Sequence, residues 1–291
     1  MTMKHIRGGA FTMGSNVAYP DEAPERRVAV ADFWVDVTPV TNAQFAAFVA
    51  ATGYITFAET PPNPADYPGM LPEMAKAGSL VFIPPSRPVS PSEGPVWWEY
   101  VFGACWKHPL GPGSTIDVLM DHPVVHVTPA DAMAYAQWAG KTLPTEAQWE
   151  FAARGGLEGK TYAWGNELQP HGVPMAKIWQ GIFPHINEAP AGLERTSPVG
   201  RYPPNAYGLH DMIGNVWEWT TDRYDAVPRA SKPCCGSPAS SDERGTIPVG
   251  VVKGGSHLCA PNYCQRYRPS ARWPQPVDTS TSHIGFRCIR P

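Results

Sequence analysis

Cys259 and Cys264 are the residues whose type and spacing could support chemistry in this chain. Four residues separate them, which is enough for a loop to fold back so that both sulfurs face one point. Two thiols held in this way can form a disulfide, bind a soft metal ion, or do both in turn. A structural zinc site has four ligands, typically in CxxC patterns, and only His257 lies close by in sequence. By ligand softness the pair best fits Cu(I), and a loop disulfide or two inert thiols are the alternatives.

The residues around the pair favour a reactive loop. Gly254 and Gly255 permit a positive φ or a close approach of another backbone, and Ser256 places a hydroxyl group next to the thiols. The following segment, 265–272, contains three arginines, and nearby cations lower the pKa of a thiol. The spacing leaves open whether any guanidinium group reaches the sulfurs.

A second group of chemically capable residues lies in segment 210–219. Asp211 and Glu218 are hard oxygen ligands with a glycine turn between them, and backbone carbonyls could join them. This composition fits Ca²⁺, although the spacing is not that of an EF-hand loop. The alternative is a surface turn anchored by Trp217 and Trp219.

The other cysteines and two histidines favour structural roles. Cys234 and Cys235 are adjacent, a geometry that strains an ordinary disulfide, so we interpret them as a loop feature. Cys105 could be a core thiol or could line the cysteine site. His122 and His126 lie in an apolar run, where a hydrogen-bonded structural histidine is expected.

Composition excludes several classes of function. Lys and Arg number 23 against 26 Asp and Glu, a net charge of -3, so there is no basic field for nucleic acid. No stretch approaches about eighteen apolar residues, so no membrane span is expected. The first residues lack the apolar core of an export signal, and six cysteines are too few for a disulfide scaffold. We therefore expect free thiols in a reducing cytoplasm.

The elements that position these residues are few. The 27 glycines and 34 prolines predict long loops, and the 11 tryptophans and 11 tyrosines predict that aromatic side chains anchor them. Three helices are expected from a threonine N-cap and a terminal glycine: Thr41 to Gly53, Thr128 to Gly140 and Thr145 to Gly155. Strands are expected at 80–83, 124–127, 249–253 and 284–288, with no further helix after 156. The chain is thus interpreted as one α+β domain, residues 1–291, with a large irregular fraction.

Several motifs give the chain a family resemblance. They are Gly8-Gly9-Ala10-Phe11-Thr12-Met13-Gly14-Ser15, Pro39-Val40-Thr41-Asn42-Ala43-Gln44-Phe45, Leu143-Pro144-Thr145-Glu146-Ala147-Gln148-Trp149-Glu150, Gly214-Asn215-Val216-Trp217-Glu218-Trp219 and Gly285-Phe286-Arg287-Cys288. With them the chain resembles the formylglycine-generating enzymes, or sulfatase-modifying factors, along nearly its full length. These segments imply a C-type-lectin-like fold with low regular content. The more specific part is Gly254-Gly255-Ser256 followed by Cys259, Cys264 and Arg266-Tyr267-Arg268, together with Trp106-Lys107-His108-Pro109 and Ile178-Trp179-Gln180-Gly181.

The resemblance implies a reaction. The cysteine of a CxPxR motif in an unfolded or nascent sulfatase is oxidised by O₂ to Cα-formylglycine, and an external reductant supplies electrons. It also implies that Cys259 and Cys264 bind Cu(I) linearly, that the substrate thiol joins as a third ligand, and that Ser256 lies beside the oxygen-reactive site. Such an enzyme binds an extended peptide, which a surface groove between long loops could accommodate.

The resemblance also implies calcium. One site of the family matches the side chains of two residues and the backbone carbonyls of two more: Asp211, Glu218, Gly214 and Val216. The family's second site would fall at Lys177 and Ala191, so we expect it to be lost, with the Lys177 ammonium group in place of the cation. Half-cystines of secreted relatives fall at Ala136 and Ala152, which leaves Cys288 without a disulfide partner, as expected in a reducing cytoplasm.

Two other functions compete with the copper-dependent oxidase. A lectin-like binding module of the same superfamily would capture a ligand without using the cysteines. A thiol–disulfide oxidoreductase would use Cys259 and Cys264 as a redox pair, although the chain has neither CxxC nor a βαβ pattern.

Overall fold

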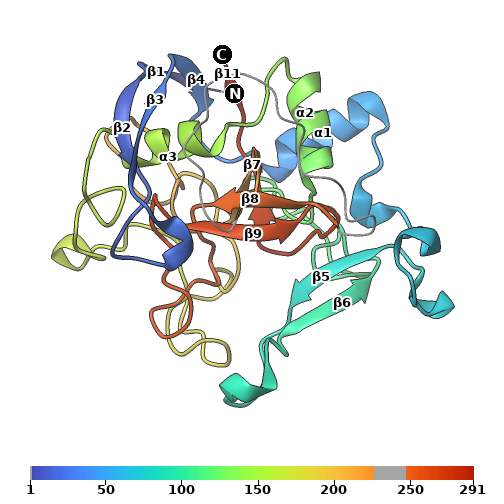
Figure 1. The fold of residues 1–291 in the computed structure, drawn as a ribbon. Coiled ribbons are helices and arrows are strands. Elements are labelled where there is room, and N and C mark those ends of the chain that lie inside the picture. The colour runs from blue at the N-terminus through green and yellow to red at the C-terminus, as the bar shows by residue number, and fades with distance from the viewer. Residues whose placement is uncertain (1, 226–246) are drawn as a thin grey trace.

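The centre of the fold is a four-stranded sheet. The computed structural model describes residues 2–225 and 247–291. In this sheet β7 (Trp217–Arg223), β8 (Val249–Lys253) and β9 (Arg272–Pro276) are antiparallel neighbours, and the short β10 (Ile284–Gly285) pairs in parallel with β7 (Figure 1). Residues 254–271, which contain Cys259 and Cys264 and which we call the cysteine loop, connect β8 to β9. The register of these two strands therefore sets the position of both ends of the loop.

Three smaller sheets surround the centre. The strands β1 (Met3–Ile6) and β11 (Ile289–Arg290) both pair antiparallel with β4 (Phe33–Asp36), which brings the two ends of the chain together (Figure 1). A second small sheet consists of the antiparallel strands β2 (Gly9–Met13) and β3 (Arg26–Val30). The hairpin of β5 (Gly78–Phe82) and β6 (Trp98–Phe102) extends from the opposite side of the molecule.

The three predicted helices are confirmed: α1 (Asn42–Thr52), α2 (Pro129–Trp138) and α3 (Glu146–Arg154). Each has a threonine N-cap in a capping box, because the Thr hydroxyl accepts from the N3 amide while the N3 side chain accepts from the Thr amide. Short 3-10 helices interrupt the connections of the described chain, at Pro20–Glu22, Phe57–Glu59, Pro64–Asp66, Pro72–Met74, Pro91–Glu93 and Pro170–Gly172. No helix among residues 2–225 and 247–291 has the length and apolarity to cross a bilayer.

The strand predictions were only partly right. Residues 249–253 form β8 as predicted, whereas the strand predicted at 80–83 begins at Gly78 and ends at Phe82. Residues 124–127 are not a strand: the amide of Val124 donates to the carbonyl of Val40, but His126 then turns to φ 61°. The strand predicted at 284–288 ends after Gly285. An apolar run also occurs where a loop crosses the core, so it predicts burial more reliably than it predicts pairing.

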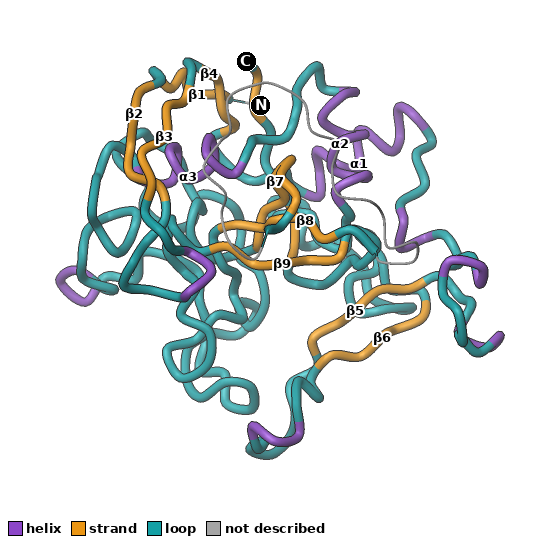
Figure 2. Tube along the Cα trace, in the orientation of Figure 1, coloured by secondary structure: helices purple, strands orange, loops and turns teal. Residues whose placement is uncertain are grey.

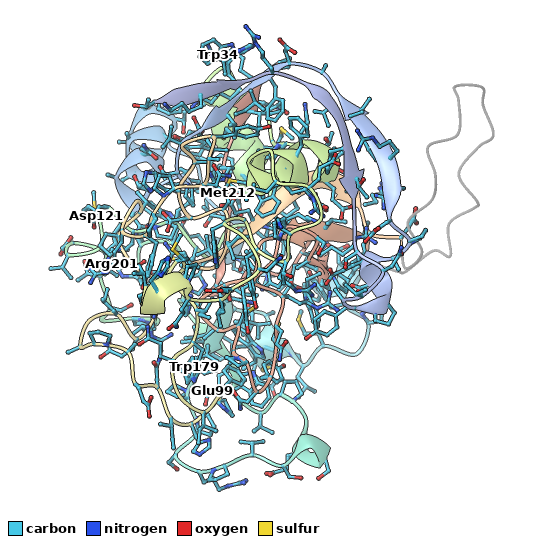
Figure 3. All side chains as sticks on the ribbon, turned by 90° about the vertical axis from the view of Figure 1, so that its left-hand side faces the viewer. Trp34, Glu99, Asp121, Trp179, Arg201 and Met212 are labelled. Atoms are coloured by element: carbon cyan, nitrogen blue, oxygen red, sulfur yellow. The ribbon has the colours of Figure 1, made fainter. Side chains whose placement is uncertain are left out.

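Loops make up much of the molecule to the left of and below the central sheet (Figure 2). The main hydrophobic core draws on residues from Ile6 to Ile289 and includes the buried side chains of Phe45 and Trp219. A smaller buried cluster packs against the cysteine loop and consists of Phe82, Trp97, Trp179, Phe183, Leu258 and Ala260. In Figure 3, Trp179 lies toward the lower end of the molecule, whereas Met212 of the main core lies near its middle. The fold is therefore an α+β fold in which aromatic side chains fix long loops.

Candidate functional site

The thiols of Cys259 and Cys264 meet. Their sulfurs are 3.4 Å apart, a hydrogen-bonding distance for sulfur and well beyond the ~2.05 Å of a disulfide bond. Both cysteines are free. The prediction that the two sulfurs face one point is confirmed, and the alternative of a loop disulfide does not describe this state of the pair.

The two glycines before the pair shape the loop. Gly254 has φ 95° and Gly255 has φ 75°, in the region that favours glycine. A Cβ atom on Gly254 would lie 2.8 Å from the carbonyl oxygen of Met212, and one on Gly255 would lie 2.8 Å from that of Arg266. The loop therefore packs directly against neighbouring backbone. The amide of Ser256 points at the Cys259 sulfur, with nitrogen and sulfur 3.5 Å apart.

A cavity of about 320 Å³ opens at the cysteine pair. Its walls are mainly aromatic, and its lining residues are Tyr19, Leu80, Trp97, Trp98, Phe183, Trp217, Ser256, Leu258, Cys259, Tyr263, Cys264, Arg266, Trp273, Gln275, Thr281 and His283. Cys259 is buried, whereas Cys264 is partly exposed. A visiting side chain can therefore approach the pair from the side of Cys264.

The pKa values of the two thiols are shifted in opposite directions. The pKa of Cys264 is lowered, first by the hydrogen bond from Cys259 and then by the Arg266 amide and the positive charges of Arg266 and Arg268. Burial raises the pKa of Cys259. Of the two thiols, the partly exposed Cys264 is therefore the one that loses its proton more readily, and the buried Cys259 is the one that keeps it. A soft metal ion, which binds thiolates, would displace the remaining proton.

Two of the three arginines of segment 265–272, Arg266 and Arg268, act on the pair through their charge, and carboxylates hold their guanidinium groups in place. Arg266 donates to both oxygens of Asp21, at 2.9 and 3.0 Å, and its guanidinium lies 4.0 Å from the ring centroid of Tyr19. Arg268 donates to both oxygens of Glu22, at 3.2 and 2.7 Å. Both carboxylates come from the N-terminal segment at Pro20–Glu22, which thus fixes the cations beside Cys264.

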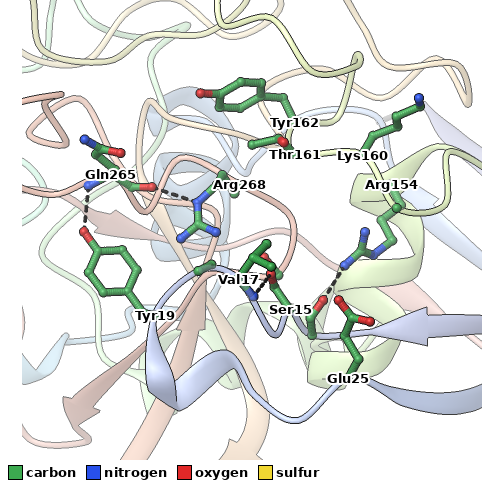
Figure 4. A pocket seen from close by; sticks show the side chains of 14 residues that line it. Ser15, Val17, Tyr19, Glu25, Arg154, Lys160, Thr161, Tyr162, Gln265 and Arg268 are labelled. Atoms are coloured by element: carbon green, nitrogen blue, oxygen red, sulfur yellow. Dashed lines mark hydrogen bonds between the residues drawn. The ribbon is translucent and has the colours of Figure 1, made fainter.

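Arg268 also borders a polar cavity of about 460 Å³ next to the cysteine loop (Figure 4). The Nε of Arg268 donates to the backbone carbonyl oxygen of Gln265, and the backbone amide of Gln265 donates to the hydroxyl of Tyr19. Tyr19 lines this cavity and the cysteine cavity, so it forms the partition between them. Arg272 faces elsewhere, since it pairs with Glu146 at the start of α3.

Sequence reasoning missed several residues of the site. The N-terminal residues Tyr19, Asp21 and Glu22 lie about 240 positions from the cysteines, and no local pattern connects them. His283 was also missed. Its Nδ1 lies 2.7 Å from the hydroxyl oxygen of Thr281, and burial lowers the pKa of its imidazole to about 3, so the ring lines the cavity in its neutral form.

The segment 210–219 provides a buried pair of carboxylates. Glu218 accepts from Arg287 at 2.7 and 2.8 Å and from the Trp149 indole at 2.7 Å, which leaves about one of the four lone-pair sites of its carboxylate free. Asp211 accepts from the Gly200 amide at 2.6 Å, but its Oδ1 is buried without a partner. Burial raises the pKa of Asp211, and a nearby cation would reverse that effect. The donor set therefore fits a hard cation, with Arg287 as a competing partner of Glu218.

Lys177 is buried, and burial lowers the pKa of its ammonium group to about 8, an effect that the charge of Glu194 opposes. Its backbone carbonyl accepts from Asn215, so it lies against the loop of the Asp211–Glu218 pair. Ala191, in contrast, is exposed. A cationic side chain is thus present where the resemblance places the family's second calcium.

The remaining candidates have structural roles. His126 is fully buried, with Nδ1 2.7 Å from the Ser79 hydroxyl and Nε2 2.9 Å from the Pro109 carbonyl, and His122 bonds Thr196. Cys105 is a buried free thiol that is not among the residues lining the cysteine cavity.

Cys288 is likewise a buried free thiol, in the same core as Ala136 and Ala152. Cys234 and Cys235 lie outside the described residues.

These features define a class of protein. Residues 1–291 match the family described as the sulfatase-modifying factor enzyme 1-like domain, and the chain belongs to this family. The fold agrees with a solved relative, PvdO from Pseudomonas aeruginosa, at a TM-score of 0.63 and 25% identity, over 99% of this chain and 93% of that one.

Among its relatives are proteins named formylglycine-generating enzyme. One from Mycobacterium tuberculosis is 52% identical over 98% of this chain and 96% of the relative, and one from Bos taurus is 44% identical over 98% and 74%. A mouse protein named inactive C-alpha-formylglycine-generating enzyme 2 is also similar, at 39% identity over 98% and 84%. Family membership therefore includes active and inactive proteins, and the cysteine site has to discriminate between them.

Proposed function

We propose that this protein converts the cysteine of a CxPxR motif in a sulfatase to Cα-formylglycine, using O₂, Cu(I) and an external reductant. The observation that carries the proposal is the convergence of Cys259 and Cys264, 3.4 Å apart, on an open aromatic cavity. Relatives named formylglycine-generating enzyme support the same activity. Cu(I) bound between the two sulfurs would supply the redox chemistry with O₂, and soft thiolates are its preferred ligands.

The overall reaction requires a reductant. Oxidation of a peptidyl –CH₂–SH group by O₂ to –CHO, with release of H₂S and H₂O, consumes two electrons and two protons. Both oxygen atoms are accounted for, one in the aldehyde and one in water. Two external thiol groups, oxidised to one disulfide, would supply both electrons and both protons.

The residues of the chain prepare the site for this reaction. The positive charges of Arg266 and Arg268 favour the Cys264 thiolate, and Asp21 and Glu22 hold those charges in place. The Ser256 hydroxyl accepts from the amide of Leu258 at 3.2 Å, which fixes the turn that carries Cys259.

The walls of the cavity suit a peptide. The indoles of Trp97 and Trp98 and the ring of Phe183 present apolar surface on which the side chains of a peptide can pack. The neutral imidazole of His283 adds a hydrogen-bonding group to this wall without a positive charge.

A peptide assay tests the function. A CxPxR peptide incubated under air with the copper-loaded protein and a thiol reductant should lose its thiol and gain an aldehyde, measured by mass spectrometry and by capture with a hydrazide. The same peptide with Ala in place of Cys, and protein treated with a Cu(I) chelator, are the controls. If the peptide keeps its thiol in the presence of copper, the proposed function is wrong.

The lectin-like binding module is the second candidate, since the family includes a protein named as inactive. It predicts that the peptide binds without conversion and that the cysteines are dispensable. The thiol–disulfide oxidoreductase predicts instead that Cys259 and Cys264 cycle between thiols and a disulfide, which a redox titration followed by mass spectrometry would detect.

We propose one calcium ion, held by Asp211 and Glu218 with the carbonyls of Gly214 and Val216, and none at Lys177. Calcium added to chelated protein at about a hundred times its Kd should stabilise the fold by about 2.7 kcal/mol, a rise of several degrees in Tm. Asp211→Ala should abolish this shift, and Asp117→Ala, at an exposed aspartate, should keep it. Two tightly bound calcium ions per chain in metal analysis would contradict the replacement of one ion by Lys177.

A reducing compartment such as the cytoplasm suits this protein. The four cysteines in the described part of the chain, Cys105, Cys259, Cys264 and Cys288, are all free thiols. The core is packed without a disulfide at Cys288, because small alanines stand at 136 and 152.

A further inference from the structure

A second cavity, of about 380 Å³, shares no lining residue with the cysteine cavity. We call it the Arg195 cavity; the residues that line it include Asn42, Trp106, Ile116, Glu194 and Arg195. Its volume lies in the range of small-molecule sites, roughly 300–1,000 Å³. Much of the wall is apolar, and a few polar groups could orient a ligand.

The first of these polar groups is the guanidinium of Arg195. It forms no ion pair with any described residue, and its Nη1 is buried without a hydrogen-bond acceptor. Burial lowers the pKa of Arg195, and only the charge of the neighbouring Glu194 opposes this. The buried arginines Arg266 and Arg287, in contrast, each pair with a carboxylate. A partly buried guanidinium without an anion is unfavourable, so Arg195 is suited to bind one.

The second polar group is the amide of Asn42, at the start of α1. Its Nδ2 donates to the carbonyl of Leu119 at 2.8 Å, which fixes the orientation of the amide. The side chain is buried, at 3% exposure, and its Oδ1 has no partner. An unpaired buried acceptor costs about 1–3 kcal/mol, and a ligand that donates an O–H or N–H group would remove that cost.

We propose that the Arg195 cavity binds a small organic monocarboxylate that also has an apolar body and a hydrogen-bond donor. The carboxylate pairs with Arg195, the donor with Oδ1 of Asn42, and the apolar body packs on Trp106 and Ile116. Glu194 lines the same cavity and is exposed, so its negative charge disfavours ligands with two charges, such as phosphate. This site is independent of the proposed copper chemistry.

Binding of 4-hydroxyphenylacetate to the full-length protein tests the proposal. Titration calorimetry and the shift in Tm should show saturable binding of the acid at millimolar concentration or below. The matched neutral amide, 4-hydroxyphenylacetamide, should bind on the order of ten- to a hundredfold more weakly, because it lacks the charge-assisted bond. Phenylacetate, which lacks the donor, should bind with intermediate affinity, and inorganic phosphate should not compete.

Variants assign the binding to this cavity. Arg195→Gln should lower the affinity for 4-hydroxyphenylacetate to that of the neutral amide. Arg195→Lys should keep part of the affinity for the acid. Arg201→Gln removes an exposed arginine outside the cavity and should change nothing. Cys259→Ser should bind the acid normally, so a failure of the conversion assay leaves this test intact. Equal binding of acid and amide, no loss in folded Arg195→Gln, or no saturable binding would overturn the proposal.

Discussion

Cys264→Ser is expected to lower formylglycine formation by at least on the order of a thousandfold while the protein stays folded. Residues that merely support a metal ligand contribute ten- to a hundredfold to affinity or activity, and a ligand itself contributes more. Cys264 is also the less buried member of the pair, on the side from which a substrate thiol can approach. Serine keeps the size of the side chain but removes the soft sulfur. Conversion of the CxPxR peptide, followed by mass, measures the loss.

Cys105→Ala is the matched control, since it removes a buried free thiol that does not line the cysteine cavity. It should retain conversion within a few-fold. A Cu(I) competition assay provides a readout besides activity, because Cys264→Ser and Cys259→Ser should both weaken copper binding and Cys105→Ala should not. Normal conversion by either serine variant would reject the mechanism, and unchanged copper affinity would place the metal elsewhere.

Arg287→Met is expected to destabilise the fold by about 3–5 kcal/mol, the usual cost of removing one partner of a buried ion pair. Arg287 is completely buried and donates to both oxygens of Glu218 and to the carbonyls of Asp36 and His210. Its loss leaves a buried carboxylate without a counter-charge. Thermal unfolding in EDTA should show a fall in Tm on the order of 10 °C.

The control is Arg27→Met, which removes an ion pair with Glu158 whose side chains are 58% and 53% exposed. Exposed pairs contribute about 0–1 kcal/mol, so its Tm should change little. The double variant Arg287→Met, Glu218→Leu should recover part of the lost stability, because it leaves no unpaired charge. Equal effects of Arg27→Met and Arg287→Met would show that the buried pair is not the source of the stability.

Local signals predicted the helices and the cysteine loop well. A capping box depends on residues three positions apart, and the positive φ of Gly254 and Gly255 is allowed by the residue type alone. The prediction of a strand at 124–127 was wrong for a physical reason. Its apolar residues are buried by the core, but the amide of Val124 bonds to Val40 and the amide of His126 to Thr281, so no ladder continues.

The amino-acid sequence by itself determined the helices, the family and the two thiols that can meet, because each depends on residues close together in the chain. Only the tertiary structure decided what surrounds them. Asp21 and Glu22 reach Arg266 and Arg268 across some 245 positions. The hydrogen bond from Cys259 lowers the pKa of Cys264 most, and the charges of these two arginines lower it further. Charge and burial act through space, at distances of a few ångströms, and folding alone determines which distant residues come that close.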